Sequence, residues 1–192
     1  DRTQELTDIL SAVSRASSTD VAEIGEAFRT VAPTANALGF EVADVSMVLG
    51  LMANNAIHGA EAGNGLKSIL SSLVKPTKNG AEALKKLGVE VADSKGNMKD
   101  LDEIIVSLQK AFAGLSEEEQ AQIATTLVGK MQMSKFLAIV NSGGDDVDKL
   151  SEAISNCTGL TEEMKNTMEA TAGGAWREFQ SVMEETAIVV GD

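Results

Sequence analysis

The apolar residues recur at gaps of three and four positions through most of the chain, which is the spacing of one face of a helix. Asp20 with Glu23 predicts the N-terminal cap of the first clear helix, and Gly39 predicts its end. Pro33 lies inside this stripe and predicts a bend or a split in the helix. The stripe consists of Val21, Ile24, Phe28, Val31, Ala35 and Leu38.

Further stripes predict a series of shorter helices along the rest of the chain. Ser116 and Glu119 form the pattern of a capping box, which predicts a helix that runs to Gly129. The glycine-rich stretch HGAEAGNG, at positions 58–65, predicts a joint between two helices. The other predicted helices span positions 42–56, 66–74, 81–87, 101–112, 133–140 and 147–154.

The last stripe is the longest and begins at Thr161, which we expect to cap a helix over residues 161–192. Glu162 and Glu163 favour the positive end of its dipole. A helix of about 30 residues is about 45 Å long, a length that favours a coiled-coil arm, although a simply packed helix is the alternative. The pattern therefore predicts a compact helical core over residues 1–160 and the start of a coiled-coil or rod-like extension over 161–192.

The stretch KKLGVEVADSKGNMKDL, from position 85 to 101, interrupts the helical pattern. A calcium loop that started at Asp93 would need an oxygen ligand at Lys95, a glycine at Met98 and a glutamate at Ile104, so the metal hypothesis fails at each position. Alternating valines followed by a polar cluster with a glycine instead predict a small β-hairpin over residues 89–99. Asp100 is expected to cap the next helix.

The composition agrees with an all-α fold. Aromatic residues make up only 3% of the 192 residues, so the core is built from aliphatic side chains. The chain contains two prolines, so its helices are seldom interrupted. The net charge is −13, which argues against direct binding of nucleic acid by this segment, because phosphate contacts rely on lysine and arginine. No apolar run is long enough to span a membrane.

The residues that could carry chemistry do not form a recognisable site. His58 and Cys157 are each the only residue of their type, so neither a zinc site nor a nucleophilic pair with an orienting third group is indicated. Three consecutive acids at 117–119 are expected to serve the start of a helix rather than acid–base catalysis. VGKMQ lacks the remaining positions of a phosphate-binding loop. We therefore expect no enzyme activity, no catalytic, cofactor-binding or metal-binding residues, and no cofactor.

Three blocks of sequence, taken in series, resemble the core region of phage tail tape measure proteins. They are HGAEAGNGLKSILSSLVKPT, ALKKLGVEVADSKGNMKDL and LSEEEQAQIATTLVGK, and the likeness extends from about Asp8 to about Ala187. The resemblance implies a structural component of the tail of a phage, a prophage or a tailocin. Such proteins scaffold tail-tube assembly, set tail length and take part in genome ejection.

The resemblance also implies partners and a location. It predicts contacts with the tail tube protein, with tail assembly chaperones and with baseplate or tail-tip hub proteins, in a homo-oligomer of few copies. The location implied is the tail lumen of the virion, after assembly in the host bacterial cytoplasm. Two other hypotheses stay open: a generic helical adaptor unrelated to phage, and a domain associated with a cell-wall hydrolase. Because the chain starts without Met and ends within an apolar run, we expect a fragment of a longer chain.

Overall fold

The computed structural model describes residues 2–163, 177, 180–181 and 183–184. Within these residues it contains nine α-helices and no β-strand, so the all-α prediction is confirmed for this part of the chain. The helices are α1 (Arg2–Ala16), α2 (Val21–Leu38), α3 (Val42–Asn54), α4 (Gly59–Val74), α5 (Lys78–Leu87), α6 (Leu101–Ala113), α7 (Glu117–Val128), α8 (Met133–Val140) and α9 (Gly144–Ser155).

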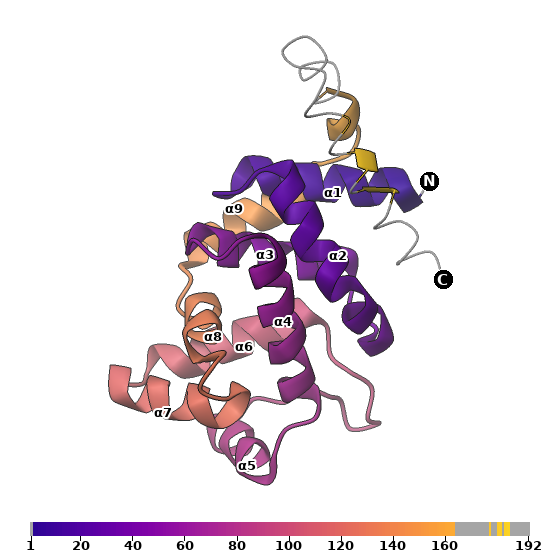
Figure 1. Cartoon of the computed structure of the whole chain (residues 1–192). Coiled ribbons are helices and arrows are strands. Elements are labelled where there is room, and N and C mark those ends of the chain that lie inside the picture. The colour runs from indigo at the N-terminus through magenta and orange to yellow at the C-terminus, as the bar shows by residue number, and fades with distance from the viewer. Residues whose placement is uncertain (1, 164–176, 178–179, 182, 185–192) are drawn as a thin grey trace.

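Helix α3 lies at the centre of the molecule and packs against α1, α2, α4, α6, α8 and α9. Figure 1 shows α1 and α9 at one end of the molecule and α5 and α7 at the other, with α2, α3 and α4 between them. Every residue from Val45 to Ala53 is buried, as expected of a helix that is apolar on all sides. The predicted helix over 42–56, with one apolar face, therefore underestimates how much of α3 is buried. Its end is also too late, because Ala56 lies outside the helix with a φ of 60°.

The glycine-rich stretch at 58–65 is not a joint but the start of α4. Gly63 lies against α2, because a Cβ at this position would be 2.6 Å from the Cβ of Thr30 and closer still to the backbone oxygen of Ala27. Small residues allow two helix backbones to approach closely, and α2 with α4 is the most extensive helix pair in the described part of the chain. The glycines therefore serve packing between helices rather than a break in the chain.

The split predicted at Pro33 does not occur, and α2 continues through this residue to Leu38. Pro33 is exposed, as is Arg29, whose carbonyl group the missing N–H would have bonded. Val31, Ala32 and Ala35 are buried on the opposite side. Burial of this face holds α2 together at the proline, which lies on the solvent side.

The β-hairpin predicted at 89–99 is wrong, because this segment contains one isolated antiparallel bridge, between Ala92 and Met98, in place of paired strands. The Asp93 carboxylate accepts hydrogen bonds from the backbone N–H groups of Lys95 and Asn97, at 2.8 and 2.9 Å. Its other oxygen accepts from the side-chain amide of Asn97, at 3.0 Å. These bonds fold residues 93–97 into a tight turn. The hydrogen bond from the Asn97 side chain, and then the one from its backbone, lower the pKa of Asp93.

We expect Asp93→Ala to loosen this turn without unfolding the protein, since the carboxylate bonds only neighbouring exposed residues. The amide protons of Lys95 and Asn97 should exchange faster with solvent by hydrogen-exchange NMR, while α6 keeps its protection. Ser94→Ala, which removes a hydroxyl group from the same turn, is the control. Unchanged exchange at Lys95 and Asn97 would show that the carboxylate does not organise the turn.

After α9 the chain is held against α1 by one buried carboxylate. Asp8 on α1 is 4% exposed, and its carboxylate accepts hydrogen bonds from the N–H groups of Gly159, at 2.8 Å, and Thr161, at 2.9 Å. Burial alone would raise the pKa of Asp8, but the hydrogen bonds from Thr161, Gly159 and Gln4 outweigh it and leave the pKa lowered. Asp8 thereby satisfies backbone donors at the start of the helical turn at 160–163.

Most of the long helix predicted over 161–192 lies outside the described residues, and so does most of its stripe. The apolar stripe of that predicted helix includes Met183, which is described. Its side chain is 3% exposed and belongs to the main apolar core. The division into a core over 1–160 and an extension over 161–192 therefore stays a prediction.

Candidate interaction surface

The two residues considered for nucleophilic chemistry are each packed with partners of their own. The Nδ1 atom of His58, just before α4, lies 3.4 Å from a carboxylate oxygen of Glu23 on α2. Cys157 is 8% exposed and packs with Ile9 and Ala12 of α1. Burial, reinforced by the charge of Asp8, raises the pKa of the Cys157 thiol, which keeps it protonated and a poor nucleophile. The structure does not pair the two side chains.

The acidic triplet at 117–119 begins α7, and its third member completes the predicted capping box. A Glu119 carboxylate oxygen accepts hydrogen bonds from the backbone N–H of Ser116, at 2.8 Å, and from its hydroxyl, at 2.9 Å. These hydrogen bonds lower the pKa of Glu119. Among the described residues, no group of three or more His, Cys, Asp or Glu side chains is placed to hold a metal ion.

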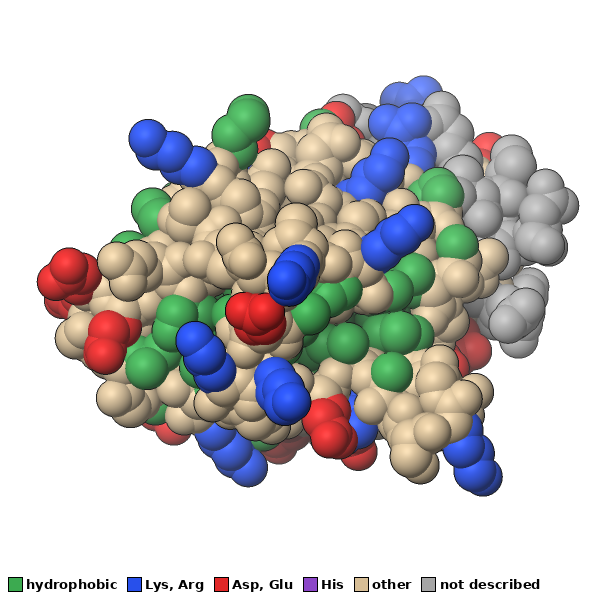
Figure 2. Space-filling view, turned by 90° about the horizontal axis from the view of Figure 1, so that it is seen from below, with side chains coloured by type: hydrophobic (Ala, Val, Ile, Leu, Met, Phe, Trp, Pro, Cys, Tyr) green, Lys and Arg blue, Asp and Glu red, His purple; other side chains and the backbone are tan. Residues whose placement is uncertain are grey.

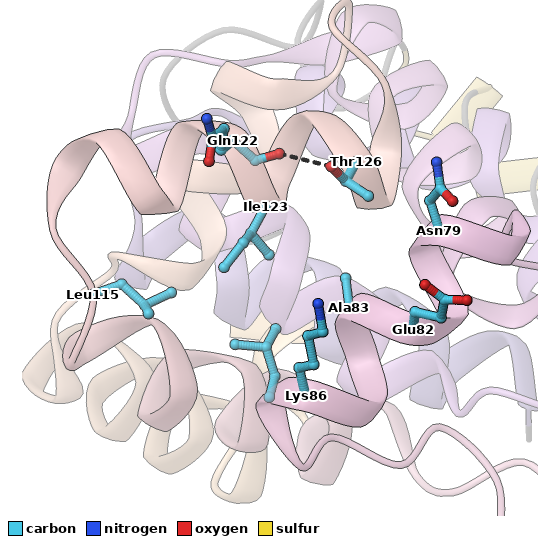
Figure 3. A pocket seen from close by; sticks show the side chains of 9 residues that line it. Asn79, Glu82, Ala83, Lys86, Leu115, Gln122, Ile123 and Thr126 are labelled. Carbon is cyan, nitrogen blue, oxygen red and sulfur yellow. Dashed lines mark hydrogen bonds between the residues drawn. The ribbon is translucent and has the colours of Figure 1, made fainter.

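A groove of about 520 Å³ lies between α5 and α7, and we call it the α5–α7 groove. Its floor is apolar and half-buried: Ala83 and Leu87 come from α5, Leu115 from the preceding turn and Ile123 from α7. Figure 3 shows these two helices facing one another across the groove. The polar rim consists of Asn79, Glu82, Lys86, Gln122 and Thr126.

The α5 side of the groove is basic, whereas α7 begins with three glutamates and has a net charge of −3. Helix α5 carries Lys78, Lys85 and Lys86 against a single acid, Glu82, so its net charge is +2 while the whole chain has −13. The three lysines are exposed, and none forms an ion pair within the described part of the chain. Figure 2, which views this end of the molecule, shows apolar side chains gathered at the centre, with several basic and a few acidic side chains around them.

The sequence contains a signal for this surface that the overall charge conceals. Residues 75–99 hold six lysines and three acids, a local net charge of +3. The predicted helix over 81–87 also omits the first turn of α5, which begins at Lys78. The pairing of α5 with α7, which creates the groove, joins segments that are separated in sequence by α6 and is not encoded in either stripe alone.

Comparison with known proteins places the chain in a family. Residues 1–129 match the family model of phage-related minor tail proteins. The chain belongs to this family. Two relatives confirm the resemblance to tape measure proteins that the three sequence blocks indicate.

The tape measure protein of Pneumococcus phage Dp-1 is 32% identical to this chain over 183 residues, and the alignment covers 95% of the chain. The probable tape measure protein of Escherichia phage P2 is 30% identical over 187 residues, which cover 96% of it. The chain spans only 16% and 23%, respectively, of the length of these relatives. No solved structure matches the chain. Among the described helices of this family member, none combines the length and the apolar character that a membrane span requires.

Proposed function

We propose that this chain is a structural segment of a phage tail tape measure protein. The observation that carries the proposal is sequence identity of 32% and 30% to two tape measure proteins over nearly the whole chain. A helical domain whose described residues assemble no catalytic site suits a scaffold better than an enzyme. Within the parent protein, its role is to support assembly of the tail tube around the tape measure, whose total length sets the length of the tail.

The proposal includes the partners and the location that the family implies. The segment lies in the tail lumen in few copies, contacts the tail tube and tail-tip hub proteins, and is handled by tail assembly chaperones in the host cytoplasm. It leaves the tube during genome ejection. Its net charge of −13 favours release over retention beside the like-charged genome.

We also propose a division of labour along the chain. Residues 1–160 form the compact core, in which α3 is enclosed by six other helices. The chain from Thr161 leads toward rod-like sequence, although Met183 packs in the core. In this arrangement the core is a folded unit of the tape measure rather than the extended ruler itself.

Protease protection of purified tails tests the proposed location. Peptides from residues 2–163 should be recovered by mass spectrometry from protease-treated intact tails, and should disappear when tails are opened before treatment. An exposed tail-fibre protein is the control for complete digestion. Digestion of this segment in intact tails would contradict the proposal. So would the absence of this segment from tails that contain other parts of the parent chain.

A further inference from the structure

The α5–α7 groove has the shape of a binding site for a helix. Residues 79, 83, 86 and 87 on α5 recur at the spacing of one helical face, and Ile123 and Thr126 provide the matching face of α7. Gly80 faces α7, since a Cβ there would make an ordinary contact, at 3.6 Å, with the backbone oxygen of Thr126. Two adjacent helices with an apolar floor between them present the surface into which a third amphipathic helix packs.

The charge around the groove specifies the chemistry of that helix. Lys86 and Glu82 lie on the rim. Lys78, one turn before Glu82 on α5, adds a positive charge at that end of the helix without lining the groove. On the α7 side, the rim residues Gln122 and Thr126 are neutral. Glu118 and Glu119, in the acidic first turn of α7, precede Gln122 and Ile123 by one turn of that helix. An occupant therefore gains from acidic side chains on the flank that faces α5, and not on its other flank.

We propose that the α5–α7 groove binds an amphipathic helix of a partner protein, with apolar anchors at i, i+3, i+4 and i+7 and acidic residues along the flank that faces α5. The inference stands on the groove and its lysines, and it does not depend on the proposed tail function.

A second copy of this chain is a poorer occupant. Its acidic helix α9 has net charge −3, but the apolar residues Val147, Leu150 and Ile154 are already packed into the chain's own core clusters. Ala124, Leu127 and Val128 of α7 are likewise buried. Among the described residues, the acidic helices thus present charge without a free apolar stripe, whereas the groove needs both.

The test measures binding of a synthetic helical peptide to the 192-residue chain by fluorescence anisotropy. The peptide of about 18 residues carries leucines at the anchor spacing and glutamates along one flank, and its counterpart carries lysines in place of the glutamates. We expect the acidic peptide to bind and to shift the methyl NMR signals of Ile123 and Leu87. The lysine peptide should bind at least about tenfold more weakly, because it meets like charges on α5.

The matched variants separate the groove from general charge effects. The double variant Lys78→Glu with Lys86→Glu should weaken binding of the acidic peptide about tenfold. The control, Lys67→Glu with Lys110→Glu, changes two exposed lysines on α4 and α6 by the same charge and should leave binding unchanged. Circular dichroism verifies that both variants are folded.

Three results would overturn the proposal. The first is no binding of the acidic peptide, or equal binding of the two peptides. The second is equal loss of binding in the two double variants. The third is a dimer of the wild-type chain in light scattering that Lys78→Glu with Lys86→Glu abolishes and the control retains, because the groove would then hold a second copy.

Discussion

Gly63→Ala is expected to lower the free energy of unfolding by about 3 kcal/mol. The new methyl group would stand 2.6 Å from the Cβ of Thr30 and would press on the backbone oxygen of Ala27. Neither atom belongs to the movable end of a long side chain, so α2 and α4 must separate. The gain in helix propensity from Gly to Ala, about 1 kcal/mol, offsets only part of this cost.

Gly144→Ala makes the same chemical change in a different environment and is the matched control. Gly144 is the first residue of α9, its φ is not positive, and a Cβ there would meet nothing within 4 Å. Urea unfolding followed by circular dichroism should show Gly144→Ala at or slightly above wild-type stability. Equal stabilities of the two variants would contradict the close approach of α2 and α4.

Asp8→Asn is the second substitution with a large expected effect, a loss of about 2 kcal/mol at pH 7. Two backbone N–H groups, of Gly159 and Thr161, donate to the two oxygens of this buried carboxylate. The amide keeps one oxygen acceptor and presents an NH₂ group to the other donor, which loses its bond. The turn after α9 should therefore detach from α1 more readily.

The pH dependence of this effect has a definite sign. The folded-state pKa of Asp8 lies below its ordinary value of 3.8, so the carboxylate stabilises the folded state above that pH. This contribution is lost as the pH falls through the folded-state pKa. The gap in stability between wild type and Asp8→Asn should thus be full at pH 7 and should close below about pH 4.

Urea unfolding at a series of pH values measures this gap. Asp148→Asn is the control, since Asp148 is an exposed carboxylate within α9. It should stay within about 0.5 kcal/mol of wild type at pH 7. A gap for Asp8→Asn that persists unchanged below pH 4 would show that the charge of Asp8 does not hold the turn.

The sequence is most informative about helices whose ends are set by local chemistry. Asp20 accepts from the N–H of Glu23 at 2.8 Å, and Gly39 ends the helix with a φ of 78°, as their residue types predict. Ser116 with Glu119 forms the predicted capping box. These features depend on residues three or four positions apart, and a stripe with its caps therefore locates a helix without knowledge of its neighbours.

Features that depend on a second helix are not visible in the same way. Gly63 looks like a breaker by its own propensity, but its neighbours on α2 make the small residue necessary. Pro33 is tolerated because burial on the far side of α2 outweighs one missing hydrogen bond. Asp93 competes for the backbone N–H groups that a hairpin would have used, and so the valines at 89 and 91 do not extend into a strand. The α5–α7 groove likewise needs the pairing of two distant segments.

The family itself could be predicted because the likeness rests on ordered blocks of sequence and not on contacts. Those blocks cover α4, the end of α5, the turn at 89–99 and α7. They name a family, but they do not show which surface a partner uses, since that depends on where the helices lie in the fold.

Electron microscopy of tails from phage with altered parent genes tests whether this segment is a folded scaffold unit of the tape measure. Deleting residues 1–160 from the parent tape measure protein should leave no complete tails, because that unit is lost. Deleting an equally long helical stretch elsewhere in the parent should give complete tails that are shorter by up to about 240 Å, at about 1.5 Å per residue. If phage that lack residues 1–160 made complete tails, either shortened to the same extent or of wild-type length, the proposed scaffold role of this segment would be contradicted.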